Sequence, residues 1–167
     1  MSTEKALLQK TVSNEVLTRL VESLPIESTT SNKRKPLKND FFKDKFGVRS
    51  AIQTGIPNTI FELIQSYTSL TDTDWAGILD ISTKSLKRYR NQEEYNFKAS
   101  HSEKIIEILE VTSMGLDVFG DMDKFKLWMH TPNFALRSLK PIELLKDSYG
   151  KELIIGELTR INYGIFI

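Results

Sequence analysis

The sequence predicts an all-α protein, with at most a short strand at its C-terminal end. Apolar residues recur at helical spacing along most of the chain, and several of these segments are preceded by N-cap signals. No segment keeps the alternation of apolar and polar residues that a half-buried strand needs. With 167 residues, of which 40% are hydrophobic and 27% charged, the chain is long enough to bury a core of its own.

Composition excludes several classes of function. The chain has no cysteine, which removes disulfides, thiolate metal sites and cysteine nucleophiles together. Its longest apolar runs are far too short to span a bilayer, and the N-terminus lacks the continuous apolar stretch of a secretory signal. We therefore expect a cytoplasmic protein that makes no contact with a membrane.

The first 50 residues predict a helix followed by a basic linker. Apolar residues at a spacing of four predict an amphipathic helix over about residues 4–24, which Pro25 ends. Residues 27–38 are polar and predict a linker. The basic tract in and after it is either an arm along a DNA backbone or a solvated surface. The apolar residues are Leu8, Val12, Val16 and Leu20, and the basic ones are Lys33, Arg34, Lys35, Lys38, Lys43, Lys45 and Arg49.

Residues 70–90 predict two short helices joined by a tight turn. Thr71 is the expected N-cap of the first helix, with Asp74 as its capping-box partner, and Ser82 is the expected N-cap of the second. Only a tight turn fits between Leu79 and Ser82, so the two helices must cross. This arrangement is typical of a helix-turn-helix, whose second helix enters the major groove of DNA.

The second of these helices carries four bases and no acid. Basic side chains neutralise phosphates and read guanine edges, although the same pattern also fits an ordinary solvated helix face. One such helix buries too little surface for operator affinity, so we expect a homodimer formed through the N-terminal half. Asp80 stands in the turn where glycine is preferred, and its charge would lie close to a phosphate. The candidate DNA-binding residues are Thr83, Lys84, Lys87, Arg88 and Arg90.

Further start and stop signals place helices before and after this pair. We divide the chain into an N-terminal helix and linker (residues 1–50), a helix-turn-helix domain (residues 51–120) and a small helical domain (residues 121–167). Pro57 begins a scaffold helix, and a capping box of Ser100 and Glu103 begins a long helix that ends at Gly120. Asp121 caps a helix that carries Trp128 in the core, and Pro141 begins a short helix. Gly164 caps a last helix over about residues 148–163, with Leu153, Leu158 and Ile161 on its apolar face.

The sequence shows no constellation for catalysis, metal binding or cofactor binding. His101 and His130 have no carboxylate at ligand spacing around them, and both are expected at the surface. The eight glycines never form a phosphate-cradling pattern. We therefore expect a protein that is not an enzyme and holds no cofactor.

Short motifs between Ile52 and Ile167 form an ordered set. They are Gly55-Ile56-Pro57, Leu79-Asp80-Ile81-Ser82 with Leu86 and Arg88, Ser102-Glu103, Val118-Phe119-Gly120-Asp121, Trp128, Thr131-Pro132-Asn133, Ala135-Leu136, Pro141 with Leu144-Leu145, Gly150, and Arg160-Ile161-Asn162-Tyr163-Gly164. In this order and spacing the set resembles the Xre/MbcA/ParS-type antitoxins. In that family a Cro/C1-like helix-turn-helix domain is followed by a toxin-binding domain, and the usual partner is a RES-domain toxin that depletes NAD.

Two positions depart from the family pattern. Asp80 replaces the usual turn glycine. Arg137-Ser138 stand where the family commonly has a Gly-Gly pair, so we expect the tight loop there to be made differently.

The resemblance implies the antitoxin of a RES–Xre type II toxin–antitoxin system, which binds its toxin through the C-terminal domain and represses its own operon. We expect the end of the chain to reach into the active-site cleft of the toxin, because three apolar side chains at a chain end are easiest to explain if a partner buries them. The alternatives are a tail that folds back on its own domain, and a stand-alone helix-turn-helix repressor without a toxin. The candidate toxin-binding residues are Arg160, Asn162, Tyr163, Ile165, Phe166 and Ile167.

Overall fold

The computed structural model describes residues 15, 18–19, 22, 41–68 and 70–165 of the chain. These residues form helices and connecting loops, with two isolated bridges (Pro57 with Asn96, Asn133 with Leu139) and no sheet strand. The all-α prediction is confirmed. Most of the helix predicted over residues 4–24 and all of the linker over residues 27–38 lie outside the described residues. No helix in the described part of the chain is long and apolar enough to cross a lipid bilayer.

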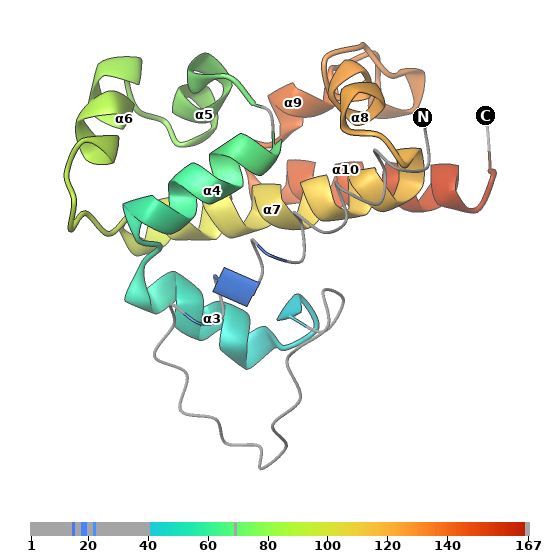
Figure 1. Cartoon of the computed structure of the whole chain (residues 1–167). Coiled ribbons are helices and arrows are strands. Elements are labelled where there is room, and N and C mark those ends of the chain that lie inside the picture. Colours follow the sequence, from blue (N-terminus) through green and yellow to red (C-terminus); the bar gives the residue numbers. More distant parts are fainter. Residues whose placement is uncertain (1–14, 16–17, 20–21, 23–40, 69, 166–167) are drawn as a thin grey trace.

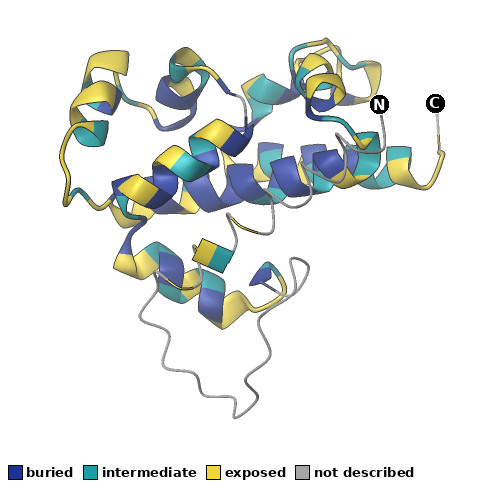
Figure 2. Cartoon of the chain, in the orientation of Figure 1, coloured by how far each residue is buried: buried dark blue, intermediate teal, exposed yellow. Residues whose placement is uncertain are grey.

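Helix α7 (Ala99–Phe119) lies at the centre of the structure (Figure 1). It packs against α3 (Lys45–Thr54), α4 (Asn58–Thr68), α8 (Met122–Met129) and α10 (Ser148–Asn162). Because neighbours surround it, α7 is buried along most of its length (Figure 2). Its core residues Ile105, Ile108, Leu109 and Leu116 are almost fully buried, as the predicted helical spacing required.

The start of α7 differs from the prediction. The helix begins at Ala99 with Lys98 as its N-cap, and no side chain caps it, so the predicted capping box of Ser100 and Glu103 is wrong. A tertiary contact fixes this end instead. The hydroxyl of Ser102 donates to the carbonyl of Phe97 and accepts from the backbone N–H of Ile56, both at 2.9 Å.

Helices α5 (Asp72–Ile78) and α6 (Thr83–Arg90) have the predicted caps. The backbone N–H of Asp74 donates to the Thr71 hydroxyl at 3.1 Å, the N–H of Thr71 donates to the Asp74 carboxylate at 2.9 Å, and the N–H of Ser85 donates to the Ser82 hydroxyl at 3.0 Å. Asp80 has a φ of 53° in the turn between the helices. The turn therefore uses the left-handed conformation that glycine normally supplies.

Helix α3 was not predicted, because its basic residues Lys45 and Arg49 were counted with the basic tract of the linker. Asp44 caps it by accepting from the N–H of Gly47 at 3.0 Å, and Phe41 and Ala51 are buried beside α7. Lys45 and Arg49 consequently lie on a packed helix rather than in an extended basic arm. In Figure 1, α3 lies on the opposite side of α7 from α5 and α6.

The C-terminal helices follow the predicted signals closely. Asp121 caps α8, α9 spans Pro141–Leu144 after the short 3-10 helix η1 (Phe134–Leu136), and α10 begins at Ser148. A Cβ at Gly115 would lie 2.2 Å from the Phe125 ring, which shows how closely α8 packs on α7. The predicted apolar face of α10 was wrong at one position. Leu153 is 56% exposed, whereas its neighbour Ile154 is buried.

A single hydrophobic cluster extends from Phe41 to Leu158 and includes buried residues on both sides of Gly120. The division of the chain at residue 120 stays a prediction.

The loop at Arg137 and Ser138 has the backbone that a Gly-Gly pair would adopt, contrary to our expectation. Their φ angles are 56° and 62°, and the N–H of Ser138 closes the loop by donating to the carbonyl of Asn133 at 2.8 Å. Side chains in this conformation are strained by about 1–2 kcal/mol per residue.

Replacing both residues by glycine (Arg137→Gly with Ser138→Gly) should stabilise the protein. The relief of strain outweighs the extra entropy of glycine in the unfolded chain, and we expect a net gain of about 1 kcal/mol and a melting temperature higher by roughly 2–4 °C. Calorimetry measures both. The control Ala135→Gly, at a neighbour without a positive φ, should lower the melting temperature. A double variant less stable than the parent would contradict the strain argument.

Candidate functional site

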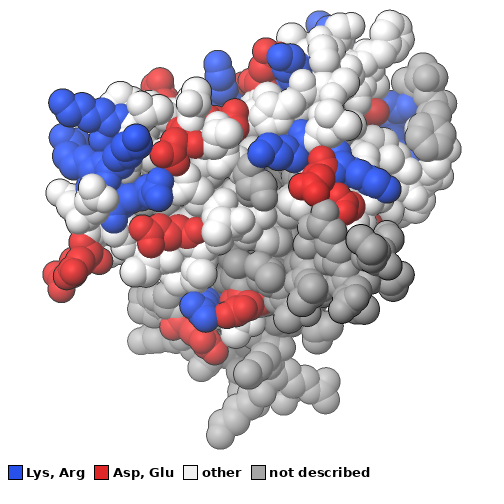
Figure 3. Space-filling model, turned by 45° about the horizontal axis from the view of Figure 1, so that its top comes forward, with Lys and Arg blue, Asp and Glu red and all other residues white. Residues whose placement is uncertain are grey.

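The basic face predicted for α6 is exposed. Thr83, Lys84, Lys87 and Arg88 all face solvent, whereas Leu86 is fully buried on the opposite side of the helix. Lys and Arg side chains gather on this part of the surface (Figure 3). No acidic residue lies in α6 itself. The structure thus brings together four of the five residues predicted for DNA contact.

Arg90 has a different environment. Its guanidinium Nη1 lies 3.0 Å from the carboxylate of Asp72, the same oxygen that accepts from the side-chain amide of Gln65 at 2.7 Å. Its backbone carbonyl accepts from the Asn58 side chain at 3.0 Å. Arg90 therefore joins the end of α6 to α5 and α4, and we treat it as a residue that positions the basic face.

His130 approaches a carboxylate that sequence spacing could not reveal. It is the C-cap of α8, and its Nε2 lies 3.6 Å from the Asp74 carboxylate at the start of α5. Burial alone would raise the pKa of Asp74, but hydrogen bonds with Thr71 and the nearby His130 ring outweigh it and hold that pKa below its usual value. The described residues contain no group of three or more side chains placed to hold a metal ion.

The prediction that His101 lies at the surface is wrong. His101 is only 7% exposed, and its Nδ1 has no hydrogen-bond partner among the described residues. Burial lowers the pKa of His101, and the positive charge of Lys98 lowers it further. The histidine is buried because it sits on the inner side of the first turn of α7, next to the ring of Phe97.

The buried His101 should make stability fall in mild acid. Below the ordinary pKa of 6.5 the unfolded chain binds a proton at this histidine, but the folded chain binds it only at lower pH. The free energy of unfolding should therefore decrease as pH falls below that value and level off below the folded pKa. Urea denaturation between pH 7.5 and 5 measures this, and His101→Leu should flatten the curve. An unchanged pH dependence in that variant, alongside a His130→Gln control, would contradict the assignment.

The C-terminal end of α10 is closed by hydrogen bonds and leads into an exposed segment. Gly164, with a φ of 67°, donates to the carbonyl of Ile161, and Ile165 donates to that of Arg160, both at 3.0 Å. This is a Schellman cap. Tyr163 is 74% exposed and Ile165 is 56% exposed, so neither folds back onto the domain. Phe166 and Ile167 lie outside the described residues.

Arg160 connects this exposed segment to the body of the domain. Its guanidinium donates to the Glu157 carboxylate at 2.7 Å and to the carbonyl of Ile165 at 3.4 Å. Glu157 also accepts from the side-chain amide of Asn133 at 3.4 Å. Glu157 was not predicted as a site residue, although its position three residues before Arg160 on one helix was a usable signal.

Several large apolar side chains in the C-terminal part of the chain are exposed, and only Leu153 among them was expected on an apolar face. They lie in and around α8, η1 and α10, and such exposure in one small region is typical of a surface that a partner covers. Periodicity could not identify them, because their spacing does not differ from that of core residues. They are Leu127, Phe134, Leu139, Tyr149 and Leu153.

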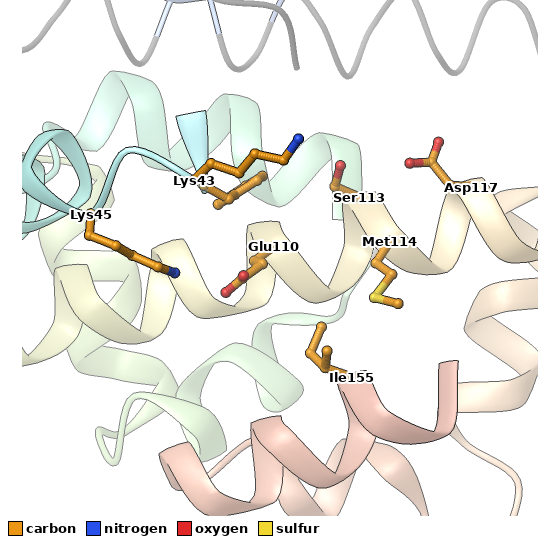
Figure 4. A pocket seen from close by; sticks show the side chains of 8 residues that line it. Lys43, Lys45, Glu110, Ser113, Met114, Asp117 and Ile155 are labelled. Atoms are coloured by element: carbon orange, nitrogen blue, oxygen red, sulfur yellow. The ribbon is translucent and has the colours of Figure 1, made fainter. Parts of the chain in front are cut away.

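A hollow of about 520 Å³ lies between α7, α10 and the start of α3 (Figure 4). Lys43 and Lys45 line it from the α3 side, and Glu110 and Asp117 line it from α7. Glu110 also forms an ion pair with Lys151 at 3.0 Å. The two lysines, which the sequence placed with the basic tract, therefore have acidic neighbours.

Comparison with protein families assigns the C-terminal part of the chain. The family model that describes the antitoxin Xre/MbcA/ParS C-terminal toxin-binding domain matches residues 114–164. Over these residues the chain is similar to the Xre/MbcA/ParS-type antitoxins. The matched residues run from the second half of α7 through α10 to Gly164, and so include the Arg160–Glu157 pair and most of the exposed apolar residues. The family resemblance seen in the sequence is confirmed.

Comparison with solved structures gives the same fold. A chain in the crystal structure of the M. tuberculosis MbcT-MbcA toxin-antitoxin complex is similar to this chain, with a TM-score of 0.51 and 21% sequence identity, over 66% of this chain and 96% of that one. No curated protein matches the sequence. The chain thus has an all-α fold that is also found in a toxin–antitoxin complex.

Proposed function

We propose that this antitoxin neutralises a RES-domain toxin, which depletes NAD, by direct binding through its C-terminal domain. The observation that carries the proposal is the exposed end of α10, a capped helix terminus from which Tyr163 and Ile165 project into solvent. Tyr163 lies within the residues matched by the toxin-binding family model, and Ile165 follows directly after them. Exposed apolar side chains at a helix end fit a cleft in a partner.

The contacts of the predicted toxin-binding residues suggest two different roles for them. Tyr163, Ile165, Phe166 and Ile167 would enter the toxin, together with Asn162, which is exposed. Arg160 would instead hold the segment in place, because its hydrogen bonds go to Glu157 and to the backbone of Ile165. Phe134, 83% exposed on η1, is a further candidate for the same interface.

The test is co-expression with the protein encoded by the neighbouring gene. A RES-domain toxin should co-purify with the antitoxin, and cellular NAD should fall when the toxin is produced alone and recover when both are produced. A neighbour that binds but leaves NAD unchanged would show a toxin of another class. The absence of any toxin gene and any binding would favour the alternative, a stand-alone transcriptional repressor.

We also propose that the antitoxin binds the operator DNA of its own operon through α6, as a homodimer. The exposed face of Lys84, Lys87 and Arg88 supports DNA contact, and the N-terminal end of α6 adds partial positive charge. One helix makes too few base contacts for operator affinity, which favours a dimer. Light scattering of the full chain at micromolar concentration tests the dimer, and a monomer that still binds its operator would contradict it.

A further inference from the structure

A second hollow, of about 400 Å³, lies beside the turn between α5 and α6 and against the start of α7. Three lysines from two segments line it: Lys98 at the N-cap of α7 and Lys104 in its second turn, and Lys146 in the link between α9 and α10. Asp80 is the one carboxylate on its wall among the described residues. The lining is therefore predominantly positive.

The start of α7 adds hydrogen-bond donors to this hollow. Lys98 caps the helix without a side-chain hydrogen bond, and the N–H groups of Ala99 and Ser100 have no acceptor among the described residues. Ser100 lines the hollow, and no acidic residue lies in the first turn of this 21-residue helix. Free N–H groups and the helix dipole together favour a bound anion.

His101 supplies an independent observation. It lines the hollow, it is more than nine-tenths buried, and its Nδ1 has no partner in the described part of the chain. A buried polar atom without a partner is destabilising, and a ligand that accepts a hydrogen bond would remove that penalty. Rotating the imidazole ring by half a turn leaves its outline almost unchanged, so either ring nitrogen can face the hollow.

We propose that this hollow binds a phosphate group. Lys98 and Lys146, which form no ion pair with a described residue, would supply the charge, and Ser100, His101 and the first N–H groups of α7 would supply hydrogen bonds. Lys104 would contribute less, because its ammonium lies 2.7 Å from the Glu107 carboxylate. The phosphate is either that of a free metabolite or nucleotide, or a phosphodiester of DNA lying beside α6.

The first experiment titrates the full-length antitoxin with inorganic phosphate and pyrophosphate at low ionic strength, followed by amide NMR. Saturable shifts of the Ala99 and Ser100 amides are expected. Lys98→Ala with Lys146→Ala should weaken binding on the order of tenfold, whereas Lys124→Ala with Lys126→Ala on α8, which removes the same charge elsewhere, should not. Asp80→Asn keeps the shape of the turn and should tighten binding roughly three- to tenfold, because it removes the one negative charge of the described wall.

The second experiment measures binding of duplex DNA by the same variants at several salt concentrations. If DNA supplies the phosphate, Lys98→Ala with Lys146→Ala should weaken DNA binding and reduce the salt slope by roughly one for each phosphate that a subunit no longer neutralises. Saturable phosphate binding that the pocket variant weakens and the control variant does not, or DNA binding that only the pocket variant weakens, supports the proposal. Equal responses of the pocket and control variants in both experiments would overturn it, whether or not α6 binds DNA.

Discussion

Deleting Ile165, Phe166 and Ile167 should weaken neutralisation of the toxin by tens to thousands of fold. Partner interfaces depend on a few apolar anchors, and removing two or three of them costs about 1–2 kcal/mol each, at about 1.4 kcal/mol for each factor of ten in affinity. A titration of toxin NAD consumption with intact and truncated antitoxin measures this change. DNA binding should not change, because the candidate residues for it lie on α6.

The fold should survive this truncation. Gly164 still donates to the carbonyl of Ile161, so the helix end keeps one of the two hydrogen bonds of its Schellman cap. A suitable control is Phe46→Ala, which removes a side chain that is 86% exposed on α3, outside the toxin-binding match; it should leave inhibition unchanged. Equal inhibition by intact and truncated chains would show that the tail does not enter the toxin. Weaker inhibition with a large fall in melting temperature would show that the tail belongs to the core.

The sequence was sufficient for elements whose ends are fixed by local chemistry. The caps at Thr71, Ser82 and Asp121 and the left-handed residue Gly120 were all predicted, because each acts within one helical turn. The start of α7 was not predicted correctly, because the Ser102 hydroxyl there accepts a hydrogen bond from Ile56, a residue 46 positions away. Local signals cannot reveal such a contact, and the Ser100–Glu103 spacing imitated a cap that the tertiary structure does not use.

The candidate sites show the same limit. Sequence spacing placed Lys84, Lys87 and Arg88 on one exposed face, since the period of a helix alone decides this. It also grouped Arg90 with them, although the neighbouring helix α5 supplies an acid that pairs with it. Asp74 and His130 come from segments far apart in the chain. The same is true of the residues that line the hollow beside the turn between α5 and α6. Only the folded structure brings these groups together.

Removing the basic face of α6 should abolish operator binding. Replacing Lys84, Lys87 and Arg88 by alanine deletes three charges per subunit, each exposed and each able to reach a phosphate or a guanine edge. If all six in a dimer contact phosphates, the parent protein should show a slope of log affinity against log salt near about −5 from these contacts, and the variant should lack that part of the slope. Leu86 is untouched, so the helix should keep its packing against the core.

A band-shift titration on the DNA upstream of the operon, repeated at several salt concentrations, measures both quantities. The matched control replaces Lys124, Lys126 and Lys140 by alanine, which removes the same charge from the C-terminal part of the chain and should leave the affinity nearly unchanged. Arg90→Ala is a separate case, because it breaks the ion pair with Asp72 and should lower the melting temperature as well as DNA affinity. If the α6 variant and the control bind the operator equally well, α6 is a solvated helix face and DNA recognition lies elsewhere in the chain.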